Sequence, residues 1–135
     1  MVKTRDTVCV IDDDIIHQFI MKKLVSDIMS DNEKRILVFS NGLEGITYLK
    51  NTINKKEDLP DIILLDLNMP IMDGWGFLNE YENLFPRLGK DIAIYILSSS
   101  DNPKDIERVK EYQKVSGYLI KPITEEELEK LINAI

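Results

Sequence analysis

The chain has 135 residues, 44% of them hydrophobic and 30% charged, and its 24 acidic and 17 basic residues give a net charge of -7. This length suits one domain with a sizeable core, and the acidic balance argues against a nucleic-acid partner, which a basic surface would bind. The single cysteine excludes an internal disulfide. We expect no signal peptide and no membrane helix, which would need roughly 18 apolar residues in a row. Together these features indicate a cytoplasmic protein without membrane contact.

Five short apolar runs predict β-strands, and polar residues follow each of them. The third run, Ile62–Leu65, consists of four large apolar residues and leaves no polar face. Such a run indicates a strand that is buried on both sides, as in the centre of a parallel sheet. The other predicted strands cover residues 7–11, 36–39, 92–97 and 117–120.

Apolar residues at helical spacing follow each predicted strand. We expect helices over residues 15–30, after the Ser40-Asn41 cap, over 74–85, over 103–114 and from Thr124 onward, with a polar turn at 31–34 and a surface loop at 51–60. Two of these helices carry apolar stripes of the kind that faces a core. The stripes consist of Ile16, Phe19, Ile20, Leu24 and Ile28 in the first helix and of Leu128, Leu131, Ile132 and Ile135 in the last.

Residues that favour helix starts precede several of these segments. Asn102-Pro103 places a cap before a proline at the first helical position, and Thr124 with Glu127 has the spacing of a capping box. Asp14 and Asp73 are interpreted as caps. Strands that alternate with helices predict an α/β fold, a doubly wound (βα)5 domain over residues 1–135 with a five-stranded parallel sheet and helices on both faces.

Polar residues that packing alone would not select stand at the ends of four predicted strands. Asp12-Asp13, Asp66, Ser98 and Lys121 are expected to share one edge, because the carboxyl ends of parallel strands meet there. Clustered carboxylates repel one another unless a cation lies between them, and Mg²⁺ prefers oxygen ligands. An aspartate nucleophile with Mg²⁺, lysine and hydroxyl groups predicts a phosphoryl-transfer site.

Four motifs stand in order at these strand ends: VIDDD, ILLDLNMPIMDG, YILSSSD and GYLIKPIT. Over nearly the whole chain they resemble the receiver domain of two-component response regulators, which has a flavodoxin-like fold. The resemblance implies a role for each matching residue. These roles are phosphoacceptor for Asp66, Mg²⁺ ligands for Asp12, Asp13, Asp66 and the backbone carbonyl of Asn68, switch hydroxyl for Ser98, phosphoryl contact for Lys121 and switch aromatic for Tyr118.

The same resemblance implies a signalling switch rather than an enzyme. A histidine kinase or phosphotransfer protein would phosphorylate Asp66, and the surface formed by the fourth helix, fifth strand and fifth helix would then change its contacts with an unknown downstream protein. The Lys121-Pro122 bond is cis in such domains. We expect a single receiver domain with no output domain, and the resemblance leaves a phosphorylation-linked dimer open.

Some residues depart from the family pattern. The segment EYQKVSGY lacks the usual small-residue turn before the fifth strand, which predicts a remodelled end of the fourth helix. Ser100 replaces a larger or charged residue, and with Asn68 it flanks the expected path of the hydrolytic water. His17 is interpreted as structural and Cys9 as an inert core residue.

Two other functions stay open at this point. A haloacid-dehalogenase-type phosphatase would use Asp12 as its nucleophile, in the acidic run Asp12-Asp13-Asp14, and would turn over small phosphate esters. A degenerate receiver would act as a constitutive interaction module without phosphorylation. The complete set of aspartates, serine and lysine argues against the second alternative.

Overall fold

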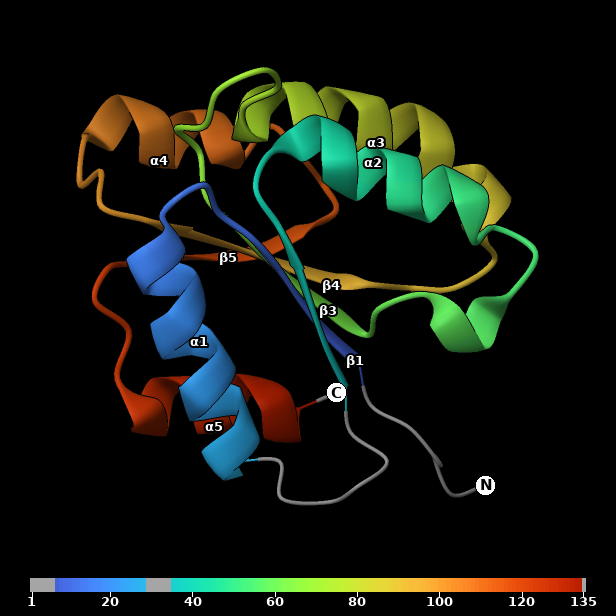
Figure 1. Cartoon of the computed structure of the whole chain (residues 1–135). Coiled ribbons are helices and arrows are strands. Elements are labelled where there is room, and N and C mark those ends of the chain that lie inside the picture. Colours follow the sequence, from blue (N-terminus) through green and yellow to red (C-terminus); the bar gives the residue numbers. More distant parts are fainter. Residues whose placement is uncertain (1–6, 29–34, 135) are drawn as a thin grey trace.

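Five parallel β-strands form a single sheet in the order β2-β1-β3-β4-β5 in this computed structural model, which describes residues 7–28 and 35–134 (Figure 1). The predicted (βα)5 fold is confirmed. The run Ile62–Leu65 forms β3 at the centre of the sheet, and all four of its side chains are buried, as expected for a strand covered on both faces. The remaining strands are β1 (Thr7–Ile11), β2 (Arg35–Phe39), β4 (Ala93–Ser98) and β5 (Val115–Ile120).

Helices cover both faces of the sheet (Figure 1). One face carries α1 (Ile15–Ile28) and α5 (Glu125–Asn133), and the other carries α2 (Gly42–Asn51), α3 (Gly74–Leu88) and α4 (Pro103–Val109). A short 3-10 helix, η1 (Lys56–Asp58), lies in the predicted surface loop. Each face has its own apolar core, because successive strand residues point to opposite sides of the sheet.

The helix starts follow the predicted capping. Asp14 Oδ1 accepts hydrogen bonds from the first turn of α1, and Asp73 accepts one from Gly76 N at the start of α3. Asn102 caps α4 with proline at its first turn, and Thr124 forms the predicted capping box with Glu127. These side chains satisfy backbone N–H groups that have no partner inside the helix.

The end of α4 differs from the sequence prediction. The helix ends at Val109 rather than near residue 114, and β5 begins at Val115 rather than at 117. Tyr112 continued the helical apolar spacing, which explains the error. In the structure its ring lies 6.1 Å from that of Trp75, and its hydroxyl donates to Asn79 Oδ1 at 2.8 Å. The side chain thus packs on α3 from a turn, outside any helix.

The pairing of β5 with β4 contains an irregularity. Ile94 pairs with Val115, but the next residue, Tyr95, pairs with Gly117, so that Ser116 is left over as a bulge. A Cβ at position 117 would lie 3.1 Å from the Tyr95 ring, which makes glycine the fitting residue there.

Only part of the predicted stripe of α1 is covered, since Leu24 and Ile28 are partly buried and pack against the core while the other three members are exposed. Ile16 and Phe19 are 73% and 69% exposed, and Ile20 is also exposed, whereas Met21 and Val25 are the side chains that the helix buries against the sheet. The helix has apolar residues on more than one face, so spacing alone did not identify the covered one.

Smaller differences concern helix ends and residues outside the description. Helix α3 continues through Pro86 to Leu88, and Gly89 follows it with φ 65°, a left-handed conformation that glycine adopts without strain. The predicted end of α1 at residue 30, the turn at 31–34 and Ile135 lie outside the described residues. Within the described ranges, every helix is too short or too polar to cross a membrane.

Candidate functional site

The predicted acidic residues gather at the carboxyl ends of β1 and β3, which are neighbours in the sheet. Asp12, Asp13 and Asp66 each offer a carboxylate oxygen, and these three oxygens lie within 4.8 Å of one another. Asp12 and Asp66 are buried, while Asp13 is exposed. Three carboxylates at this spacing fit a hard, oxygen-preferring cation such as Mg²⁺, which keeps part of its water shell on the open side.

Lys121 reaches the same cluster from the end of β5. Its Nζ lies 2.8 Å from Asp12 Oδ2 and 3.5 Å from Asp66 Oδ2. The Lys121-Pro122 peptide bond is cis, as the resemblance implied, and Lys121 N donates to Ser98 O at 2.8 Å. The structure therefore brings together the lysine and both buried aspartates.

The loop after β3 holds Asp66 in a confined backbone environment. Asp66 Oδ1 accepts a hydrogen bond from Leu67 N at 2.8 Å, and Leu67 O accepts one from Gly74 N at 2.9 Å. A Cβ at Gly74 would lie 2.5 Å from Asp66 O, so only glycine fits where α3 begins behind the aspartate. In the same loop Ile71, with φ 68°, occupies a conformation that β-branched residues rarely adopt.

Ser98 and Tyr118 are linked through the loop that follows β4. Ser98 is fully buried, and its Oγ accepts a hydrogen bond from Ser100 N at 3.1 Å. The Tyr118 hydroxyl donates to Ser100 O at 2.7 Å, and the Ser100 hydroxyl donates to Asp105 at 2.7 Å. The two predicted switch residues thus contact the same residue, Ser100, from different sides.

Two residues of α1 contact Asp12 in ways that the sequence analysis missed. His17 Nδ1 lies 2.5 Å from Asp12 Oδ2, and Gln18 Nε2 donates to Asp12 O at 2.5 Å. His17 is the third residue after the Asp14 cap, and helical side chains tilt toward the N-terminus of their helix. That tilt, applied to the first turn after an acidic loop, was the signal that could have identified His17.

These contacts shift the pKa values of the charged groups in different directions. Burial raises the pKa of Asp12, but hydrogen bonds from His17 and Lys121 outweigh burial and hold the value at about 2. Burial raises the pKa of Asp66 above its ordinary range, and the nearby charge of Lys121 only partly opposes this rise. Burial lowers the pKa of Lys121, while the hydrogen bond to Asp12 and the charge of Asp66 raise it above its ordinary value. Of the two buried aspartates, Asp66 is therefore the one whose negative charge is less well stabilised by neighbouring groups.

Asn68 is exposed in the loop two residues after Asp66, and its backbone N–H helps to lower the pKa of the Asp66 carboxyl, against the larger effect of burial. The proposed use of its carbonyl as a cation ligand stays a prediction.

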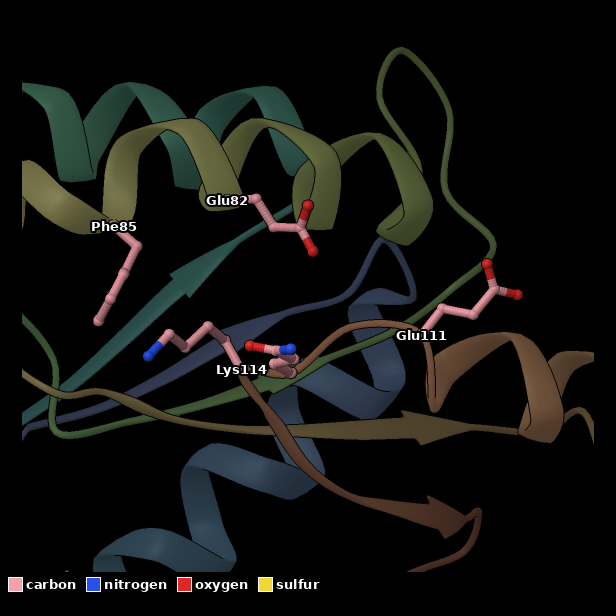
Figure 2. A pocket seen from close by; sticks show the side chains of 5 residues that line it. Glu82, Phe85, Glu111 and Lys114 are labelled. Carbon is pink, nitrogen blue, oxygen red and sulfur yellow. The ribbon is translucent and has the colours of Figure 1, made fainter.

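A separate cavity lies between α3 and the turn after α4, lined by Glu82, Phe85, Glu111, Gln113 and Lys114 (Figure 2). Lys114 Nζ lies 3.6 Å from the centre of the Phe85 ring there, and the cavity shares no residue with the acidic cluster.

Comparison with protein families gives a match over nearly the whole chain. The family model of the response regulator receiver domain covers residues 8–133. The probable methanogenesis regulatory protein FilR2 of Methanothrix harundinacea is 31% identical over 101 residues, which cover 75% of this chain and 63% of that protein. The chain spans less than two thirds of the length of the curated relatives it matches.

Solved structures agree with this match. The crystal structure of a two-component response regulator from Cytophaga hutchinsonii has a TM-score of 0.83 and 27% identity, and the alignment covers 98% of this chain and 97% of that one. A sensor histidine kinase receiver domain from Pseudomonas aeruginosa PAO1 has a TM-score of 0.76 over 96% and 95% of the two chains. That structure holds a magnesium ion in its active site cleft, and its 18% identity to this chain shows a shared fold.

Proposed function

The chain belongs to the response regulator receiver family of two-component signalling, and from this premise we propose that Asp66 is its phosphoacceptor. Receiver domains are signalling switches that are phosphorylated on an aspartate. In our proposal a histidine kinase or phosphotransfer protein supplies the phosphoryl group, and Mg²⁺ is held by Asp12, Asp13 and Asp66, with the Asn68 carbonyl as a further ligand.

The observation that carries the proposal is the position of Asp66 relative to the other charged groups. Its carboxylate ends the central strand, lies within 4.8 Å of two further carboxylates and faces Lys121 Nζ at 3.5 Å. Asp12 is less suited to be a nucleophile, because His17 and Lys121 both contact its Oδ2 and Asp14 N donates to its Oδ1. This contrast favours a receiver over the phosphatase alternative.

The transfer step follows from these positions. An oxygen of the ionised Asp66 attacks phosphorus, the new P–O bond forms as the P–N bond to the donor histidine breaks, and the electron pair of that bond leaves with the imidazole nitrogen. Lys121 holds positive charge beside Asp66 Oδ2, where charge on the phosphoryl oxygens develops. When bound, Mg²⁺ neutralises further charge on those oxygens.

We propose that the signal passes to the surface of α4, β5 and α5 through Ser100. If the Ser98 hydroxyl turns to the phosphoryl group, its acceptor role toward Ser100 N is lost, and Ser100 O also holds the Tyr118 hydroxyl. A cavity of about 390 Å³ between α4 and β5 has Tyr118 among its lining residues, so a change at Tyr118 would alter this surface. The downstream partner would be a protein that reads this change.

The remaining expectations are part of the same proposal. A single receiver domain over residues 1–135 stays a prediction, as do the absence of nucleic-acid binding and the phosphorylation-linked dimer. A cytoplasmic location is a further proposal; the single cysteine, the free and buried Cys9, is compatible with a reducing compartment.

The direct test is the intact mass of the protein after incubation with acetyl phosphate and Mg²⁺, with Asp66→Asn as the matched variant. We expect one added phosphoryl group on the wild type, none on Asp66→Asn and none when a chelator is present. Hydrogen exchange on the phosphorylated sample, compared with the unmodified one, should change in α4 and β5 if Ser100 transmits the signal.

Other outcomes would redirect the proposal. If Asp66→Asn were phosphorylated to the same extent as the wild type, the phosphoacceptor would be a residue other than Asp66. Steady release of free phosphate from small phosphate esters, undiminished in Asp66→Asn, would favour the phosphatase alternative with Asp12 as nucleophile. Because some receivers accept phosphate only from their kinase, the experiment is repeated with a phosphorylated histidine donor before Asp66 is rejected.

A further inference from the structure

His17 lies beside the acidic cluster without being one of the side chains that could share its cation. Its Nδ1 is 2.5 Å from Asp12 Oδ2, whereas the grouped carboxylates are those of Asp12, Asp13 and Asp66. An ionised carboxylate only accepts hydrogen bonds, so Nδ1 carries the proton of this contact. The His17 side chain is 13% exposed and that of Asp12 is 3% exposed, so water has little access to either partner.

The donors around Asp12 are not equivalent. Asp14 N donates to Oδ1 at 3.0 Å, and Lys121 Nζ and His17 Nδ1 both contact Oδ2. Lys121 is shared, because it also lies 3.5 Å from Asp66 Oδ2. When a phosphoryl group on Asp66 attracts the lysine, His17 is the side-chain donor that remains on Asp12 Oδ2.

Hydrogen bonds in the first turn of α1 constrain the position of His17 relative to Asp12. It lies in the first turn of α1, whose cap Asp14 accepts hydrogen bonds from Ile16 N and His17 N. The next residue, Gln18, donates to the backbone carbonyl of Asp12. The first turn of α1 thus holds both the backbone and the carboxylate of Asp12, each through a different residue.

We propose that His17 is a positioning residue of the cation site, which fixes the rotation of the Asp12 carboxylate so that a divalent cation meets an ordered ligand. The inference rests on the proposed function, since it requires Asp12 to bind that cation. Hydrogen-bond partners of metal ligands commonly change metal affinity by about 10-fold to 100-fold when they are removed. An effect of this size is expected for His17.

The test measures Mn²⁺ binding at one fixed pH from the electron paramagnetic resonance signal of the free ion, with Mg²⁺ as competitor. His17→Leu removes the donor and keeps much of the volume. His17→Asn places an amide N–H near the position of Nδ1. Phe19→Ala, an exposed change on the same helix, is the matched control, and urea unfolding of every variant reports the stability of the fold.

We expect His17→Leu to weaken Mn²⁺ binding by about 10-fold to 100-fold. His17→Asn should restore most of the affinity, and Phe19→Ala should bind as the wild type does. A structural role of His17 alone would shift the urea midpoint without this rescue pattern. If His17→Leu does not fold, His17→Ala replaces it, because the smaller side chain cannot overpack the site.

Three results would overturn the inference. The first is equal affinity of wild type and His17→Leu, which would show that the contact does not order Asp12 for the cation. The second is an equal loss of Mn²⁺ affinity in His17→Leu and His17→Asn, and the third is a loss of the same size in Phe19→Ala. Either result would show that the helix, and not the hydrogen-bond donor at position 17, determines the affinity. A wild type that binds no Mn²⁺ or Mg²⁺ is a separate result, because it would overturn the cation part of the proposed function and the role of His17 with it.

Discussion

Helices α1 and α5 pack on the same face of the sheet, yet they use their apolar residues differently (Figure 1). In α5 the predicted stripe is the covered one, since Leu128 and Ile132 are buried and Leu131 packs against the same core. In α1 four large apolar residues are exposed on the first turns of the helix. These are Ile15, Ile16, Phe19 and Ile20, with exposed fractions of 77%, 73%, 69% and 46%.

The difference shows that an apolar stripe identifies the covered face only when the opposite face is polar. Helix α5 has the sequence EEELEKLIN, in which charged or polar residues fill every position outside the stripe. Helix α1 has the sequence IIHQFIMKKLVSDI, whose apolar residues extend around the helix. The covered pair Met21 and Val25 and the exposed pair Ile16 and Phe19 therefore look alike in the sequence, and the tertiary structure decides between them.

The largest effect that would test this comparison is expected at Leu128. The side chain is fully buried under α1 and the sheet, so Leu128→Ala should lower the free energy of unfolding by about 2–5 kcal/mol through lost burial and a residual cavity. Urea unfolding followed by circular dichroism measures the change. A loss far below this range would mean that α5 is loosely attached and that the stripe does not determine its packing.

An intermediate effect is expected at the start of α5. Thr124 accepts a hydrogen bond from Glu127 N at 3.0 Å, and Glu127 Oε1 accepts one from Thr124 N at 3.0 Å. Thr124→Ala removes the first bond and should cost about 0.5–2 kcal/mol of unfolding free energy. Thr124→Ser keeps the hydroxyl and serves as the control. If the two variants were equally unstable, the loss would come from the threonine methyl group and not from the cap.

Much of the fold and of the site was predictable for a simple physical reason. Apolar runs bounded by polar residues mark buried strands, and parallel strands bring their carboxyl ends to one edge. Asp12, Asp66 and Lys121 each directly follow such a run, so their convergence could be expected from the sequence. Their chemical roles are proposals that the geometry supports.

The features that were missed depend on side-chain direction and on tertiary packing. His17 was interpreted as structural from its apolar helical neighbours, and its contact with Asp12 was missed because helical spacing ignores the tilt of the side chain. The sequence predicted a remodelled end of α4 but placed it near residue 114 instead of at Val109, because Tyr112 continues the apolar spacing while its ring packs on Trp75 from a turn. In both places the residue type was informative, but its neighbour across the fold was not visible in the sequence.

The smallest effect is expected at Phe19, because this apolar side chain of α1 is exposed, whereas the apolar stripe of α5 is covered. Because 69% of Phe19 is exposed, Phe19→Gln should change the free energy of unfolding by no more than about 0.5 kcal/mol, and glutamine is at least as favourable in a helix. Met21→Ala on the same helix is the control, since this fully buried side chain should cost about 2–5 kcal/mol. Urea unfolding of both variants measures the contrast. A large loss in Phe19→Gln would show that the first turns of α1 are covered in the folded protein, and α1 and α5 would then follow the same rule after all.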